Sequence, residues 1–148
     1  MKRLSAILSL SIGLLLLSTA LQAINPLPQG KWKVSQVTIE KNTDGNTETT
    51  AYKEVEKIRS YFTPFKSWEI NEKNIVINCL KDRKETANYA IEGNQLKVMT
   101  AFASQLYQYN VNGENLILTT TYNYVNNLPT GQTERIEEKW TINLKKQQ

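Results

Sequence analysis

One carboxylate lies on an otherwise apolar face near the end of this sequence. Residues 133–144 read TERIEEKWTINL, and alternation of period two places Ile136, Glu138, Trp140 and Ile142 on the same side of a strand. A carboxylate on an apolar face needs hydrogen-bond partners or a wet cavity. Glu138 is therefore a candidate ligand contact. The competing interpretations are a bulge that turns Glu138 outward, or simple hydration near a rim.

Aromatic residues form the second candidate group. Tyr122 and Tyr124 alternate along 115–125, and Tyr107 and Tyr109 form a similar pair on the preceding segment. A tyrosine has an apolar ring and a polar tip, which suits an amphipathic ligand. The same residues equally suit cross-strand packing on a half-buried sheet. Phe65 and Trp68 are expected at the entrance to the same site, or in the core.

Missing residue types exclude several kinds of chemistry. The sequence has no histidine, which removes serine–histidine and cysteine–histidine catalysis and the commonest metal ligand. The single cysteine, Cys79, shares a face with Ile75 and Ile77, which predicts an inert buried thiol. We therefore expect a protein that is not an enzyme and has neither metal nor cofactor. Carboxylate chemistry around Glu138 is the remaining enzymatic alternative.

The N-terminal residues have the pattern of a secretory signal peptide. Lys2 and Arg3 precede an apolar run, which small residues at Ser18, Ala20 and Ala23 follow. Cleavage after Ala20 or after Ala23 fits this pattern. No cysteine follows the apolar run, so we expect no lipid anchor. The sequence thus predicts a signal peptide at 1–23 and one exported domain at 24–148, periplasmic or secreted.

The charge pattern argues against a nucleic-acid partner. Without Lys2 and Arg3, 16 basic residues face 14 acidic ones, a net charge of +2. Charges of both signs alternate in segments such as KDRKE (81–85), which is typical of a solvated face. Nucleic-acid binding requires a clustered basic surface, and no run of the sequence supplies one.

The chain from residue 30 onward predicts an all-β domain. Short alternating segments recur about every ten residues, at 31–41, 67–72, 74–80, 86–92, 95–101, 105–111, 115–125 and 133–144. This spacing favours an antiparallel sandwich or barrel. The first segment changes phase near Ser35–Gln36, which indicates a bulge or bend. Up-and-down closure into an eight-stranded barrel removes exposed edges and is the architecture we expect.

Residues 42–65 interrupt the series of strands. Ala51, Val55, Ile58 and Phe62 recur at helical spacing, and Pro64 follows them. This predicts a short amphipathic helix inserted between the first and second strands. A strand extension is the competing interpretation.

The turns predict which end of the barrel is closed. If strands alternate in direction, the short turns at 71–74, 92–95 and 111–115 gather at one end, with Gly30. The insert at 42–65 and the loop at 126–132 lie at the other. This arrangement describes a cup with a closed base and an elaborated mouth.

Three features of the sequence are the Gly30-Lys31-Trp32 opening, a bend in the first strand, and an eight-stranded meander that follows a leader. In these features the sequence resembles the lipocalin family. More narrowly, residues 27–146 are similar to small exported lipocalin-like domains of Bacteroidetes-type bacteria. The resemblance implies that Gly30 and Trp32 form the base of the barrel. It also implies a basic side chain over Trp32, for which Lys145 or Lys146 is suitably placed.

These observations lead to two functional hypotheses. The first is an exported barrel that holds a small apolar or amphipathic ligand in its cup, with 42–65 as a partial lid. The ligand contacts are then expected at the mouth, at Phe65, Trp68, Tyr107, Tyr109, Tyr122, Tyr124, Glu138 and Trp140. The alternative is an envelope interaction module or inhibitor, which uses the mouth loops around a filled barrel. Neither the ligand nor the oligomeric state follows from the sequence.

Overall fold

The computed structural model describes residues 26–60, 62 and 64–148, so the predicted signal peptide lies outside the described residues. The described chain is all-β. Its strands are β1 (Gly30–Thr43), β2 (Asn46–Tyr52), β3 (Phe65–Ile70), β4 (Asn74–Cys79), β5 (Lys84–Glu92), β6 (Gln95–Met99), β7 (Ser104–Asn112), β8 (Asn115–Asn127) and β9 (Thr133–Lys146). The helical content is limited to two 3₁₀ turns, η1 (Val55–Lys57) and η2 (Leu80–Asp82).

Eight of the strands close into an antiparallel barrel, which confirms the predicted fold class. Neighbours in sequence are paired from β3 to β9, and β1 pairs with β3 on one side and with β9 on the other. β2 lies outside this ring and pairs with the outer half of β1. The eight predicted strands all occur, with ends shifted by a few residues.

A bulge in β1 explains the phase change seen in the sequence. The register between β1 and β9 shifts between Val34 and Gln36, which leaves Ser35 as the extra residue. Ser35 Oγ donates a hydrogen bond to the Asn143 carbonyl oxygen at 3.0 Å. The extra residue places Trp32 and Val37, which are an odd number of positions apart, in the same buried core.

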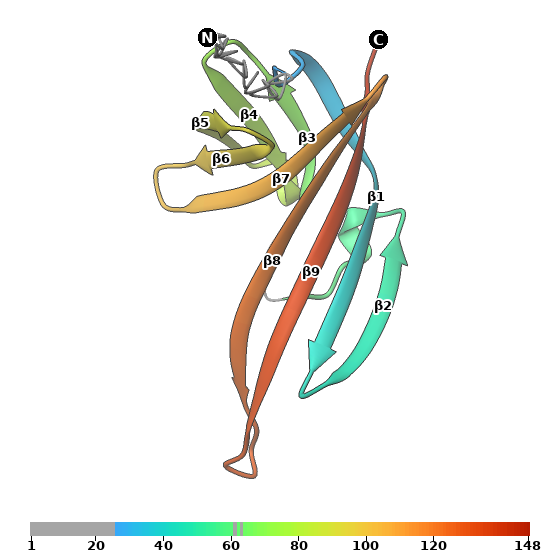
Figure 1. Ribbon diagram of the computed structural model, residues 1–148, viewed down its shortest axis with the longest axis vertical. Helices are drawn as coiled ribbons and strands as arrows, with labels where there is room; N and C mark the ends of the chain where they lie inside the picture. The colour runs from blue at the N-terminus through green and yellow to red at the C-terminus, as the bar shows by residue number, and fades with distance from the viewer. Residues whose placement is uncertain (1–25, 61, 63) are drawn as a thin grey trace, which may run out of the picture.

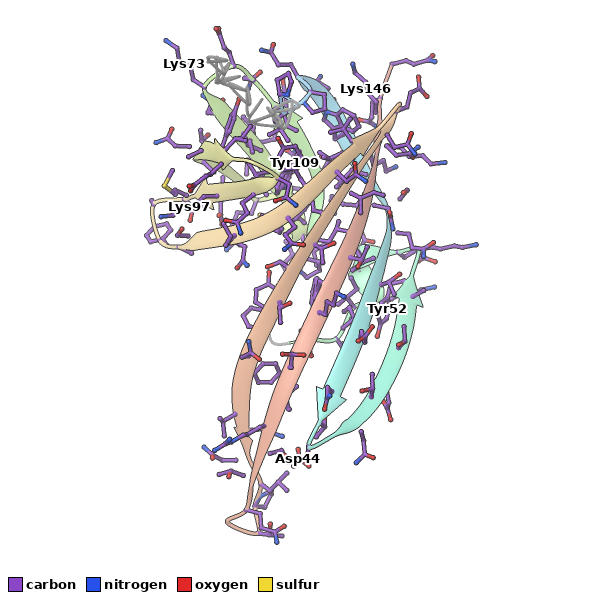
Figure 2. The ribbon with its side chains drawn as sticks, viewed as in Figure 1. Asp44, Tyr52, Lys73, Lys97, Tyr109 and Lys146 are labelled. Atoms are coloured by element: carbon purple, nitrogen blue, oxygen red, sulfur yellow. The ribbon has the colours of Figure 1, made fainter. Side chains whose placement is uncertain are left out.

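Trp32 lies in the core at the base of the barrel. Trp32 is fully buried, and its indole Nε1 donates to the Pro28 carbonyl oxygen at 3.0 Å. Lys146 Nζ lies 6.0 Å from the centre of the Trp32 ring, so Lys146 supplies the basic cover. Gly30 has φ +123°, a conformation that favours glycine. Figure 2 shows Lys146 and Lys73 at this end of the molecule and Asp44 far toward the other.

The long strands continue beyond the barrel (Figure 1). β2 and the outer parts of β1, β8 and β9 form a four-stranded sheet, which we call the wing (residues 37–52, 120–127 and 133–142). The β8–β9 hairpin reaches furthest from the base. The wing thus forms an extended platform on the mouth side of the barrel.

The predicted helix at 42–65 is wrong in its first half. Residues 46–52 form β2, which a tight turn at Asp44–Gly45 joins to β1. Both turn residues have positive φ, as a two-residue hairpin requires. Thr47, Thr49 and Thr50 favour a strand because β-branched side chains are stiff in a helix. The competing strand extension is therefore the correct interpretation here.

The second half of that segment crosses the barrel mouth. We call residues 53–60, 62 and 64 the crossing segment. Val55 and Ile58 are buried in the core, and Phe62 packs against it. The apolar residues at helical spacing therefore contact the barrel, although the segment that carries them is not an α-helix. η1 contributes a single turn of 3₁₀ helix to this segment.

Candidate functional site

Glu138 is the centre of a polar cluster at the barrel mouth. Its side chain faces inward, and the residue is only 3% exposed. It accepts three hydrogen bonds: from Ser60 Oγ (2.7 Å) and Trp140 Nε1 (3.0 Å) at Oε2, and from the Tyr124 hydroxyl (2.7 Å) at Oε1. The structure thus places the carboxylate on the predicted apolar face and contradicts the outward bulge.

The environment keeps Glu138 ionised. Burial by itself raises the pKa of this carboxyl group. The hydrogen bonds from Ser60, Trp140 and Tyr124, together with the charge of Lys41, outweigh burial and lower the pKa below its ordinary value. Lys41 is directly opposite Glu138 in the β1–β9 register. Within the described residues, however, no cation forms an ion pair with Glu138 at 4 Å or less. The carboxylate is therefore held by neutral donors.

Aromatic rings surround this carboxylate. Phe62 stacks on Tyr122 with ring centres 3.6 Å apart, and Tyr122 meets Trp140 edge-on at 5.7 Å. Phe62 also meets Tyr124 edge-on at 5.9 Å. The crossing segment thus supplies both a ring and a hydroxyl group to the site, from Phe62 and Ser60.

The tyrosines of the cluster remain protonated at neutral pH. Burial, followed by the effects of Glu138, raises the pKa of Tyr124 to about 12. Burial raises the pKa of Tyr122 to about 12, although its hydrogen bond with Tyr107 opposes the shift. Burial also raises the pKa of Tyr107. These hydroxyl groups therefore act as hydrogen-bond donors and have no tendency to act as bases.

The other predicted site residues lie deeper in the barrel. Phe65 stacks on Trp68 at 4.9 Å, and Trp68 meets Tyr107 edge-on at 5.5 Å. Tyr109 is nearer to the base, where its backbone N–H donates to the Asn94 carbonyl oxygen (2.9 Å) in the β5–β6 turn (Figure 2). Of the eight predicted contacts, Tyr122, Tyr124 and Trp140 gather around Glu138, and Tyr107 is linked to this group by its hydrogen bond with Tyr122. Phe65, Trp68 and Tyr109 belong to the core.

The sequence analysis missed Ser60, and it assigned Phe62 only to a helical face. Ser60 is separated from Glu138 by 78 positions, and no local pattern distinguishes it from other serines. Lys41 was also missed. It could have been found by extending the Glu138 face across the predicted β1–β9 pair.

Among the described residues, the hollow beneath the crossing segment is small. The cavity between the crossing segment and the barrel has a volume of about 20 Å³ and is lined by Phe65, Tyr107, Tyr122 and Trp140, among others. That is room for one water molecule. Larger hollows lie outside, about 510 Å³ at the end of the wing and about 550 Å³ near the base. The site as it stands is filled by Ser60 and Phe62.

The fold and the site together define a closed, eight-stranded antiparallel β-barrel with an extra strand, an architecture compatible with a lipocalin-like fold. Comparisons with protein-family models, with curated proteins and with solved structures gave no match that assigns the chain to a family. Within the described residues, no helix is long and apolar enough to cross a membrane. The same residues contain no group of three or more cysteine, aspartate or glutamate side chains arranged to hold a metal ion.

Proposed function

We propose that this chain is an exported, lipocalin-like interaction module, whose wing receives an extended strand of a partner protein along β2. The observation that carries this proposal is the outer edge of β2. Within the described residues, β2 pairs with β1 alone, and seven consecutive residue pairs hold it in regular register. The small hollow beneath the crossing segment, about 20 Å³, supports the same proposal, since it has no room for a ligand larger than one water molecule.

The register identifies the backbone groups that a partner strand would use. A two-residue turn joins Thr43 to Asn46. In a hairpin of this kind the two residues that flank the turn form a hydrogen-bonded pair. Hydrogen-bonded and non-hydrogen-bonded pairs then alternate along an antiparallel ladder. Thr47, Thr49 and Ala51 therefore direct their N–H and C=O groups away from β1. These groups form the free edge.

β2 lacks most of the devices that usually protect an edge. Natural edge strands carry proline, charged side chains (lysine above all) or a bulge, and the one charged residue of β2 is Glu48. Residues 46–52 read NTETTAY, with no proline and no lysine, and their pairing with β1 is continuous. All but Tyr52 are exposed. Such an edge is suited to strand addition, in which main-chain hydrogen bonds give affinity and alternate side chains give specificity.

Photo-crosslinking in cells that naturally produce the protein tests this proposal. A photoreactive amino acid at Thr47 should capture a discrete partner, and Thr49→Pro should abolish the capture because it removes an outward N–H without breaking a bond to β1. The same probe at Lys97, a strand position paired on both sides, is the control. Capture that is equal at Lys97, or that survives Thr49→Pro, contradicts strand addition.

A second candidate function is the binding of a small amphipathic molecule at the mouth. The specific observation in its favour is Glu138, an ionised and buried carboxylate that neutral donors and aromatic rings surround. A ligand with a hydrogen-bond donor and a flat ring would replace the contacts of Ser60 and Phe62. Since the cavity measures about 20 Å³, such a ligand requires the crossing segment to move away.

Mass spectrometry of the natively purified protein tests the second candidate. A co-purifying small molecule should be lost or weakened by about 1 kcal/mol or more in Tyr122→Ala, if the ring contacts it. Tyr89, whose hydroxyl group bonds to the β3–β4 turn at the base, supplies the control Tyr89→Ala. Unchanged retention in Tyr122→Ala removes Tyr122 from the site.

A further inference from the structure

Four lysines meet around one hollow near the base of the barrel. The hollow has a volume of about 550 Å³ and is lined by Lys33, Lys53, Lys145 and Lys146, with Val34, Ser35, Gln147 and Gln148. No aspartate or glutamate lines it. The four lysines come from three parts of the chain, the start of β1, the residue after β2 and the end of β9. Only the closed barrel brings them together.

Two of these lysines face each other directly. Lys33 on β1 is opposite Lys145 on β9, and both side chains are exposed because the neighbouring Trp32 and Leu144 point inward. Directly opposed residues have Cβ atoms about 5 Å apart, and like charges in this arrangement are destabilising. The pair therefore has an unfavourable interaction that a bound anion would relieve.

Within the described residues, no aspartate or glutamate forms an ion pair at 4 Å or less with any of the four lysines. The ion pairs within this distance involve Lys57, Lys66 and Arg83. Lys31, two residues before Lys33 on the same strand, has a carboxylate residue, Glu69, directly opposite on β3. In the same register, Lys33 has Ser67 opposite on β3 and Lys145 has Asn115 opposite on β8. The lysine pair is thus flanked by uncharged residues.

The net charge of the whole domain shows that positive charge is concentrated at the hollow. Residues 26–148 carry 16 basic and 14 acidic side chains, a net charge of +2. Because the hollow holds four of the positive charges, the remaining surface has a net charge of −2. Such an uneven distribution concentrates a positive field at one place and attracts anions to it.

We propose that this hollow binds a phosphate-bearing ligand. Lysine presents a compact point charge with three N–H donors, and several lysines around one hollow suit the dense negative charge of a phosphate group. The volume lies in the range of small-molecule sites and exceeds what a single phosphate needs. The phosphate belongs either to a soluble compound or to a lipid headgroup.

Titration with inorganic pyrophosphate tests the site. The wild-type protein should bind pyrophosphate at low ionic strength, and the Lys33→Gln/Lys145→Gln double variant should bind it at least about ten-fold more weakly. Lys73→Gln/Lys97→Gln removes the same charge from outside the hollow and should bind as the wild type does. Absence of binding, or equal weakening in both variants, overturns the proposal.

Thermal unfolding gives an independent readout. Without an anion, Lys33→Gln/Lys145→Gln should unfold at a higher temperature than the wild type, because the opposed charges are gone. With pyrophosphate present, the order should reverse, since only the wild type gains from binding. Sodium chloride at matched ionic strength must fail to reverse the order. If sodium chloride also reverses it, simple screening explains the effect and the site is rejected.

Vesicles distinguish the two sources of phosphate. Sedimentation with phosphatidylcholine vesicles, with and without phosphatidic acid, is compared for the same variants. Retention on phosphatidic acid vesicles that requires Lys33 and Lys145 identifies a lipid headgroup. Pyrophosphate binding without retention identifies a soluble phosphate compound. Retention that both double variants share equally reflects net charge and contradicts a headgroup site in the hollow.

Discussion

The two ends of this barrel are closed by different physical means. At the base, Trp32 is buried beneath Lys146, and residues close in sequence, Pro28 and Gly30, complete the closure. At the mouth, Glu138 accepts hydrogen bonds from Tyr124 on the neighbouring strand and from Ser60, which is 78 positions away in an irregular segment. The base therefore depends on the burial of one ring, whereas the mouth combines the apolar contacts of the crossing segment with the polar network of Glu138.

The largest expected effect is at the base. Trp32→Ala removes a fully buried ring and its hydrogen bond to Pro28, and should lower the free energy of unfolding by about 3–5 kcal/mol. Denaturant titration followed by circular dichroism measures this loss. Trp32→Phe keeps most of the packing and should cost less. A loss below about 1 kcal/mol in Trp32→Ala would show that the base is not held by this residue.

Glu138→Ala should have the next largest effect, at the mouth. It leaves the hydroxyl groups of Ser60 and Tyr124 and the Trp140 indole without their acceptor, which should cost about 2–3 kcal/mol. Hydrogen exchange should also increase in the crossing segment and not in the β3–β4 turn at the base. The control Glu138→Gln retains the shape and one acceptor oxygen. Equal exchange at both ends would contradict the separate closure of the mouth.

Two buried tryptophans, Trp140 and Trp68, differ in whether their indole N–H group has a hydrogen-bond acceptor. The indole N–H of Trp140 donates to Glu138, whereas Trp68 Nε1 is buried without a hydrogen-bond partner among the described residues. Trp140→Phe should therefore destabilise the protein by about 1–2 kcal/mol more than Trp68→Phe, in which an unsatisfied donor disappears. Denaturant unfolding of the two variants measures the difference. Equal losses would mean that ring volume alone determines the loss of stability. The hydrogen bond from Trp140 to Glu138 would then contribute nothing measurable.

Much of the base was predictable from sequence because most of its determinants, with the exception of Lys146, are local. Alternation along 31–41 indicated the bulge, and the short turns with Gly93 and Gly113 fixed the closed end. The resemblance pointed to Lys145 or Lys146, of which Lys146 covers Trp32. At the mouth, alternation placed Glu138 inward, but its partner Ser60 comes from an irregular segment.

The insert was predicted incorrectly because two patterns competed in it. The helical spacing from Ala51 to Phe62 was real, yet it reflected contacts of an irregular chain with the barrel. The threonines of β2 and the Asp44–Gly45 turn favoured a hairpin, and the free edge of β1 supplied the hydrogen bonds that a strand needs. Tertiary pairing thus overrode a local helical pattern. The hollow lined by lysines was not predicted from the sequence for a related reason. Lys33, Lys53 and Lys145 become neighbours only in the closed barrel.

The smallest expected effect is the pH dependence of the mouth. The pKa of Glu138 is lowered in the folded protein, against burial, by its hydrogen bonds and by Lys41. The ionised form thus contributes stability that is complete above the ordinary pKa of 4.5 and is lost as the pH falls through the lower folded value. Free energies of unfolding at several pH values should show the advantage of wild type over Glu138→Gln shrinking only below about pH 4.5. The difference between wild type and Trp32→Phe, a change at the base, should stay constant over the same range. The difference in unfolding free energy between wild type and Glu138→Gln could also stay constant with pH. In that case the charge of Glu138 does not contribute to closure of the mouth, and only the shape of the side chain matters.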